Sequence, residues 1–220
     1  MEIDHIFIAV KPHAPEADVL RAFGLQEGTP NRHVGQGTAN RRFFFHNLFV
    51  ELLWLEDAAE AQSPVTLPTQ LFARLQPIQP QVSPFGICLR PSVGEAPTVP
   101  FAHWFYQPAY LPASLSIPIA TPTPLQEPMW FMLTFGQPPI HLPAEKRQPL
   151  QHQPALQQVT SVRLHQPIPA VWSQAAECAI TAGCLEVIAA TEHWLELVFD
   201  HAKTGNTHDF RPHLPLVLQY

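Results

Sequence analysis

The sequence predicts an α+β fold built from a repeated unit of one strand, one helix and further antiparallel strands. Two observations support this prediction. An apolar strand, an amphipathic helix and two more strands follow one another near the N-terminus, and the same order returns in the last third of the chain. In addition, Glu51 and Glu196 occupy matching positions in the short apolar runs 49–53 and 194–198. Matching element order together with a matching glutamate indicates a diverged βαβββ repeat.

The composition is typical of a globular protein. Hydrophobic residues make up 46% and charged residues 14% of the 220 residues, which is enough apolar material for a sizeable core. The net charge of −6 comes without a basic block, which argues against a nucleic-acid partner. The apolar runs have the length of strands and predict no membrane helix. Three cysteines without a CxxC pair, and an N-terminus without a basic segment, favour a cytoplasmic protein.

The first unit is expected in residues 1–57. Its first strand is apolar at nearly every position, as in a buried strand. A proline in the first turn and a glycine just after the last turn frame the helix, and His46-Asn47 favours a hairpin turn between the last two strands. The expected elements are strands at 3–10, 41–45 and 49–55, a helix between Pro15 and Gly24, and a polar loop over 28–40.

The last unit is expected in residues 151–220. Pro167 ends its first strand, and Gly183 closes its helix, which carries Val171 on its apolar face. The tail 209–218 is expected to be one final strand. The other expected elements are strands at 159–164, 185–190 and 193–199 and a helix over 170–182.

The central part, residues 58–150, is expected to be a degenerate β module. The chain has 26 prolines, concentrated between Pro64 and Pro169, and they exclude long helices and the interiors of central strands. The same stretch is too rich in aromatic residues for a solvated linker. Short strands, among them 85–90 and 128–133, joined by proline-fixed loops are therefore expected. The three parts are expected to form one compact unit.

Three segments resemble the vicinal oxygen chelate superfamily, and most closely its glyoxalase-like branch. The segments are 3–10, 33–43 and 49–54, which together cover about the first quarter of the chain. The superfamily includes glyoxalase I, bleomycin-resistance proteins and extradiol dioxygenases. In its members, paired βαβββ modules curl into mostly antiparallel half-barrel sheets, with helices on the outer face. The resemblance implies that the concave face holds a metal or a ligand.

The resemblance implies a site around His5 and Glu51, which match the first metal pair of metal-dependent members. Strand alternation puts His5 on one face with Ile3 and Phe7, and Glu51 on one face with Leu53. A carboxylate among apolar neighbours must be paired, metal-bound or protonated. Glu51 is therefore the stronger candidate, as a base or a ligand, and His5 is a ligand or a hydrogen-bond donor.

Each of these residues also has a structural alternative. Glu51 could form an ion pair with Arg42, and His5 could bond to a neighbouring strand. A divalent metal would take His5, Glu51 and Glu196 as ligands. Ser161 stands where His5 stands in the first unit, however, so the ligand set looks incomplete and the cofactor is unknown. Glu196 has a structural partner in Arg163.

The segment 33–42 supplies the other candidate ligand-binding residues. They are His33, Gln36, Thr38, Asn40 and Arg42. Backbone amides beside glycines and an arginine suit a carboxylate or phosphate. An ordinary polar loop has the same composition, and the glycine spacing matches no phosphate loop. The resemblance is what favours the binding role.

Three hypotheses about function follow. The first is a glyoxalase-like enzyme of the lyase, isomerase or dioxygenase type that acts next to a carbonyl, with Glu51 as base and Arg42 as an anion clamp. The second is a non-catalytic protein of the bleomycin-resistance type that sequesters an apolar or aromatic ligand. The third is an interaction module that uses the proline-rich middle. In the first two the partner is a small molecule, and a monomer and a homodimer are both consistent with the sequence.

Overall fold

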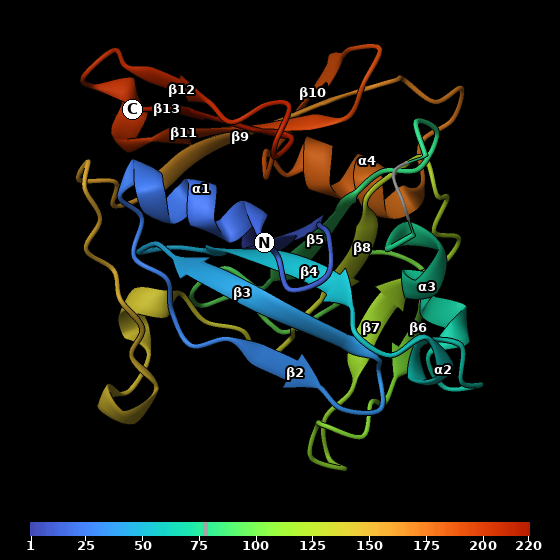
Figure 1. Cartoon of the computed structure of the whole chain (residues 1–220). Helices are drawn as coiled ribbons and strands as arrows, with labels where there is room; N and C mark the ends of the chain where they lie inside the picture. Colours follow the sequence, from blue (N-terminus) through green and yellow to red (C-terminus); the bar gives the residue numbers. More distant parts are fainter. Residues whose placement is uncertain (77–78) are drawn as a thin grey trace.

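The strands form two open, mixed sheets. Figure 1 shows a computed structural model, which describes residues 1–76 and 79–220. The larger sheet has eight strands in the order β2-β3-β4-β1-β5-β8-β7-β6, and the smaller has five in the order β10-β9-β11-β13-β12. Neither sheet pairs its two edge strands within the described residues, so neither closes into a barrel. The expected α+β class is confirmed. None of the helices in the described part of the chain has both the length and the apolar character to cross a bilayer.

The eight-stranded sheet contains the same pairing twice. Strand β1 is parallel to β4, β5 is parallel to β8, and β1 joins β5 in the antiparallel direction. Helix α1 follows β1, whereas residues 91–102 after β5, all described, contain no helix. The elements are β1 (Glu2–Ala9), α1 (Glu16–Phe23), β2 (Asn31–His33), β3 (Thr38–Phe44), β4 (Phe49–Leu55), α2 (Ala58–Ala61), α3 (Leu71–Arg74), β5 (Phe85–Arg90), β6 (His103–Tyr106), β7 (Ile117–Ala120) and β8 (Met129–Met132).

The polar stretch 28–40 is a hairpin instead of the expected loop. Strand β2 pairs with the start of β3, with Asn31 opposite Asn40 and His33 opposite Thr38. Gly35 and Gly37 have φ angles of 82° and 76°, which glycine adopts without steric cost. Their left-handed conformations let the chain reverse between the two strands.

The last third forms the five-stranded sheet, and its pairing differs from that of the first unit. Strand β11 lies antiparallel to β9, whereas β4 lies parallel to β1. The expected equivalence of the strands of Glu51 and Glu196 is therefore wrong. The reason is that α4 leads directly into β10, which pairs with β9, so β11 takes the other side of β9. The elements are β9 (Val159–Gln166), α4 (Gln174–Thr181), β10 (Glu186–Ala189), β11 (Trp194–Phe199), β12 (Thr207–Asp209) and β13 (Leu216–Gln219).

Two element boundaries in this part also differ from expectation. Helix α4 begins only after Ser173, whose hydroxyl accepts a hydrogen bond from the Ala176 N–H, because a serine N-cap satisfies a free helix amide. Val171 therefore precedes the helix and is 79% exposed. The tail forms two antiparallel strands, β12 and β13, instead of one. Pro212 and Pro215 lie between them, and proline interrupts the interior of a strand.

The two helices α1 and α4 lie between the two sheets (Figure 1). Ile8 of β1, Leu20 of α1 and Leu197 of β11 belong to the core that fills this layer. Phe45 packs on Phe199 within it, with ring centroids 4.6 Å apart. A second core covers the opposite face of the eight-stranded sheet and includes Phe7, Leu53, Leu71 and Phe131. The candidate site belongs to this second face.

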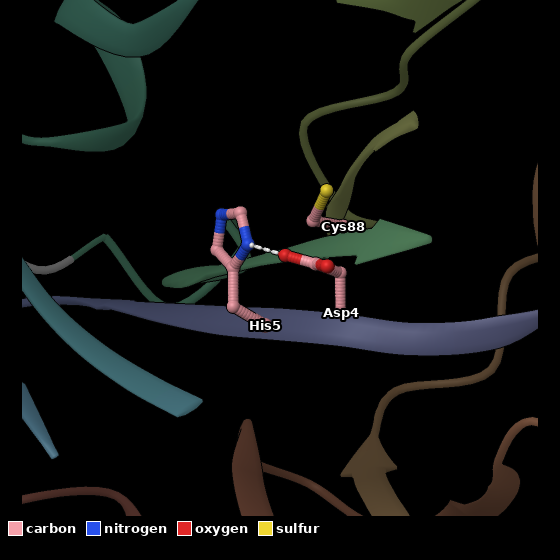
Figure 2. A group of neighbouring side chains, drawn as sticks. All are labelled: Asp4, His5 and Cys88. Carbon is pink, nitrogen blue, oxygen red and sulfur yellow. Dashed lines mark hydrogen bonds and ion pairs between the residues drawn. The ribbon is translucent and has the colours of Figure 1, made fainter. Parts of the chain in front are cut away.

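A β-bulge in β1 determines which face its first side chains use. Ile3 lies opposite Leu89 and His5 lies opposite Cys88, so Asp4 is the extra residue of the bulge. Ile3 therefore joins the core between the sheets, and the prediction that it shares a face with His5 is wrong. Figure 2 shows Asp4 and His5 on the same side of the β1 ribbon.

Replacing Phe199 by alanine tests the packing between the layers. Because Phe199 is fully buried, we expect Phe199→Ala to lower the free energy of unfolding by about 3–5 kcal/mol, measured by urea denaturation. The matched control is Phe105→Ala, since Phe105 is 64% exposed, and its effect should stay below about 1 kcal/mol. Equal unfolding midpoints for the two variants would contradict the assigned core.

Candidate functional site

A cavity of about 170 Å³ opens on the second face of the eight-stranded sheet. Polar side chains line one end of this cavity, and the remainder of its wall is mainly apolar and aromatic. A more open hollow of about 630 Å³ lies beside Arg21, Gln26 and Pro149, and it contains none of the candidate site residues. The cavity, by contrast, brings together six of them: His5, His33, Gln36, Asn40, Arg42 and Glu51.

Glu51 lies at the centre of the polar end of the cavity. Its carboxylate oxygen Oε1 accepts a hydrogen bond from Asn40 Nδ2. The Nε2 atom of His5 is 3.7 Å from Glu51 Oε2, and the Nε2 atom of His33 is 4.0 Å from Glu51 Oε1. Glu51 is only 5% exposed. A carboxylate removed from water in this way needs polar neighbours, and the amide and the two imidazoles supply them.

Asp4 fixes the orientation of the His5 ring. Its Oδ1 atom lies 2.8 Å from His5 Nδ1 (Figure 2), and its Oδ2 atom lies 3.6 Å from Nη1 of Arg90. Phe49 stacks on the His5 ring at a centroid distance of 4.5 Å. A carboxylate that accepts a hydrogen bond from one ring nitrogen sets the role of the other. Here Nε2 faces Glu51 and the cavity.

Strand alternation hid Asp4 from the sequence-based prediction. An unbroken strand would put Asp4 on the face opposite His5, toward the core between the sheets. Two consecutive polar residues, Asp4 and His5, within an otherwise apolar strand are the one signal of the bulge. That signal is weak, because a polar pair also occurs at strand ends.

A chain of hydrogen bonds holds the His33 ring in place beside Glu51. Gln36 Nε2 donates to Thr38 Oγ1 at 2.8 Å, which leaves the Thr38 hydroxyl able to donate to His33 Nδ1, 2.9 Å away. The Tyr110 hydroxyl donates to Gln36 Oε1 at 3.1 Å. Thr38 therefore supports the site from behind the cavity wall. Tyr110 comes from the loop between β6 and β7, and no pattern in the sequence marks it.

Burial shifts two pKa values in this group. Burial lowers the pKa of His33, the charge of Glu51 opposes this shift, and the nearby Arg42 and His5 add to it. A neutral His33 that accepts at Nδ1 carries its proton on Nε2, toward Glu51. Burial also raises the pKa of Tyr110 far above its usual range, so Tyr110 acts as a hydrogen-bond donor at neutral pH.

Arg42 faces Glu51 across β3 and β4 without forming an ion pair. The two residues are direct cross-strand partners, yet no carboxylate in the described part of the chain lies within 4.0 Å of the Arg42 guanidinium. Its Nε donates to the Thr29 carbonyl at 2.8 Å, and the guanidinium lies over the Phe44 ring at 5.2 Å. The alternative of a structural ion pair between Glu51 and Arg42 is therefore wrong.

Glu196 lies in the other sheet, away from this cavity. Its neighbours Leu195 and Leu197 point into the core between the sheets, so Glu196 points to the outer face. There it binds Arg163 Nη1 at 2.6 Å, and its Oε2 lies 3.4 Å from His165 Nε2. The proposed metal set of His5, Glu51 and Glu196 is therefore wrong, whereas the structural pair of Glu196 with Arg163 is present.

The residues around the cavity do not fit a metal ion as they stand. Metal–ligand bonds of about 2.0–2.2 Å bring all ligand atoms within roughly 4.4 Å of one another. Among the described residues, only Asp4, His5 and Cys88 place three ligand atoms within 4.8 Å (Figure 2). Burial raises the pKa of the Cys88 thiol well above its usual value, so a metal ion at this position would have to displace the thiol proton. Asp4 and His5 already bond to each other beside the Arg90 cation.

Comparison with known proteins supports the fold alone. No family model matches the chain, and no curated protein matches it either. A hypothetical protein from Staphylococcus aureus, known from a crystal structure, is similar with a TM-score of 0.55 and 10% sequence identity. The match covers 99% of this chain and 97% of that chain. At this level of identity the similarity shows that the two chains share a fold, and it carries no information about function.

Titration of the buried histidines predicts how stability depends on pH. The pKa of His33 in the folded protein lies below its unfolded value of 6.5. Below about pH 6.5 the unfolded chain therefore binds more protons than the folded one, so the free energy of unfolding decreases as the pH falls. We expect a lower free energy of unfolding at about pH 5.5 than at about pH 7.5. Burial lowers the pKa of His152 and His193 as well, so His33→Gln should reduce this loss without abolishing it. An unchanged loss in His33→Gln would contradict the assigned burial.

Added metal ions test the ligand geometry. Since no three described residues of the cavity wall place their ligand atoms within 4.8 Å of one another, we expect zinc, nickel or manganese at micromolar concentrations to leave the melting temperature unchanged. Differential scanning fluorimetry measures this. A bound ion would raise the melting temperature, and the rise would grow with the logarithm of the ion concentration above the dissociation constant. A rise that disappears in His5→Ala would show that the site closes around a metal.

Proposed function

We propose that the protein is a small-molecule enzyme of the glyoxalase-like type, in which Glu51 moves a proton at a carbon next to a carbonyl group. One observation carries the proposal. Glu51 is a buried carboxylate that faces a cavity, lies within 4.0 Å of two imidazoles and has no arginine or lysine partner among the described residues. A positioned carboxylate that a ligand can reach suits general acid–base catalysis.

The strand pairing supports the family resemblance behind this proposal. Two βαβββ modules joined side by side, the second without its helix, would produce the repeated parallel pairs β1–β4 and β5–β8. We infer that residues 1–57 and 58–150 are such a pair. Residues 151–220 then form an additional layer over the helical face.

In the proposed reaction the cavity residues act in sequence on one proton. Glu51 takes the proton from the carbon, and the electron pair of that bond moves onto the carbonyl oxygen. The Nε2–H of His33 faces this region and would stabilise the negative oxygen. Glu51 returns the proton to a different carbon or oxygen atom of the ligand, so that the atoms balance. Asp4 keeps the ring of His5 aligned with Glu51, and His5 exchanges the proton held on Glu51 with solvent before its return, one proton leaving as another enters.

A second candidate function is sequestration of a ligand without chemistry. The apolar part of the cavity wall favours it, since apolar walls with few polar groups are typical of binding pockets. The residues concerned are Phe7, Phe49, Leu53, Leu71, Leu111, Ile117, Ile119, Met129, Phe131, Leu133 and Phe135.

Proton exchange in D₂O distinguishes the two functions. The enzyme proposal predicts that the protein exchanges the hydrogen next to the carbonyl in a member of a panel of small carbonyl compounds, followed by NMR. Glu51→Gln should lower that rate by about 10²–10⁴-fold, because the amide cannot accept the proton. Glu145→Gln is the matched control, since Glu145 is exposed and outside the cavity. Equal rates in Glu51→Gln and the wild type would overturn the proposal, and binding without exchange would favour sequestration.

A further inference from the structure

Arg42 carries a positive charge on the cavity wall that no carboxylate balances within ion-pair distance in the described residues. The neighbouring Arg41 shows the contrast, because it binds Glu27 at 2.6 Å and Asp18 at 3.1 Å. Arg42 is half-buried, and burial lowers its pKa against the attraction of Glu51. A guanidinium stays charged under all ordinary conditions. The cavity therefore offers a partly desolvated cation to whatever binds in it.

The protein fixes this guanidinium at one edge and leaves the other edge open. Nε donates to the Thr29 carbonyl at 2.8 Å, whereas the two Nη atoms form no hydrogen bond within the described part of the chain. Below the guanidinium runs a stack of rings. Phe44 packs on Phe49 at 4.8 Å, and Phe49 packs on His5 at 4.5 Å. The stack ties the position of Arg42 to that of His5.

The open edge has the geometry of a carboxylate receptor. Two parallel N–H groups of a guanidinium match the two oxygens of a carboxylate. A phosphate would carry a second negative charge toward Glu51, the cross-strand neighbour of Arg42, and among the described residues neither a second arginine nor a lysine lines the cavity to offset it. The charge pattern therefore favours a monoanion.

The size of the cavity limits the rest of the ligand. An apolar cavity of about 150 Å³ holds one benzene molecule, and this one has about 170 Å³. Phe7, Ile119 and Phe131 line the apolar part of its wall. A single ring, or an aliphatic group of the same size, fills this space.

We propose that the cavity binds a small monocarboxylic acid with an apolar body of about one ring, whose carboxylate pairs with the two Nη atoms of Arg42. The inference rests on the proposed function, since it concerns the same site and names the class of substrate. In this arrangement Arg42 holds the carboxylate, the aromatic wall holds the body, and the carbon between them lies near Glu51.

Calorimetry with phenylacetate and the neutral phenylacetamide tests this inference. We expect phenylacetate to bind at millimolar concentrations and to lose at least tenfold in affinity in Arg42→Gln, with phenylacetamide unaffected by the substitution. Arg42→Lys keeps the positive charge but lacks the two parallel N–H groups. Its affinity for phenylacetate should therefore lie between those of the wild type and Arg42→Gln. Arg32→Gln is the matched control, because Arg32 is an exposed arginine of β2 outside the cavity. Circular dichroism confirms that each variant is folded.

Three outcomes would overturn the inference: no binding of phenylacetate to the wild type at millimolar concentrations, equal binding of phenylacetate to Arg42→Gln and the wild type, or displacement of phenylacetate by inorganic phosphate at an equal or lower concentration. The proposed function can fail separately. Arg42-dependent binding without proton exchange would remove the enzyme proposal and keep the carboxylate site. Proton exchange together with ligand binding that does not depend on Arg42 would remove the carboxylate site and keep the enzyme proposal.

Discussion

Asp4 has no partner in β5, and this one extra residue turns its carboxylate onto the face that carries His5. The contact of 2.8 Å between Asp4 and His5 Nδ1 then fixes the ring, and Nε2 is left facing Glu51. Arg90, almost fully buried at 1% exposure, lies 3.6 Å from Asp4 and offsets its charge. Without the bulge, Asp4 would enter the apolar core between the sheets, where an isolated carboxylate costs several kcal/mol.

The parallel pairing of β1 with β4 brings the rest of the site to this point. In that register Phe7 lies opposite Glu51 and His5 lies opposite Phe49. Strand β3 adds Asn40 and Arg42 from the other side of β4. Three neighbouring strands therefore supply His5, Glu51 and Arg42. Their rigid pairing positions these groups more narrowly than a loop would.

Sequence reasoning succeeded where a local rule decides the outcome. Alternation along β4 predicted that Glu51 and Leu53 share a face, and both line the cavity. Gly24 was predicted to end the first helix, and it has the left-handed φ of 113° expected there. The failures concern features that depend on tertiary contacts. The bulge at Asp4 depends on how β5 pairs with β1, and the direction of β11 depends on where β10 joins the sheet. Alternation and element order contain neither piece of information.

The protonation state of the His5 ring tests the central claim most directly. Nitrogen-15 NMR of histidine-labelled protein, with His5 assigned by comparison with His5→Gln, distinguishes a protonated Nδ1 from an unprotonated one. The account predicts a proton on Nδ1 in the wild type, held by Asp4, and loss of this preference in Asp4→Ala. A neutral ring with its only proton on Nε2 in the wild type would contradict it, since Asp4 could not then orient His5 toward Glu51.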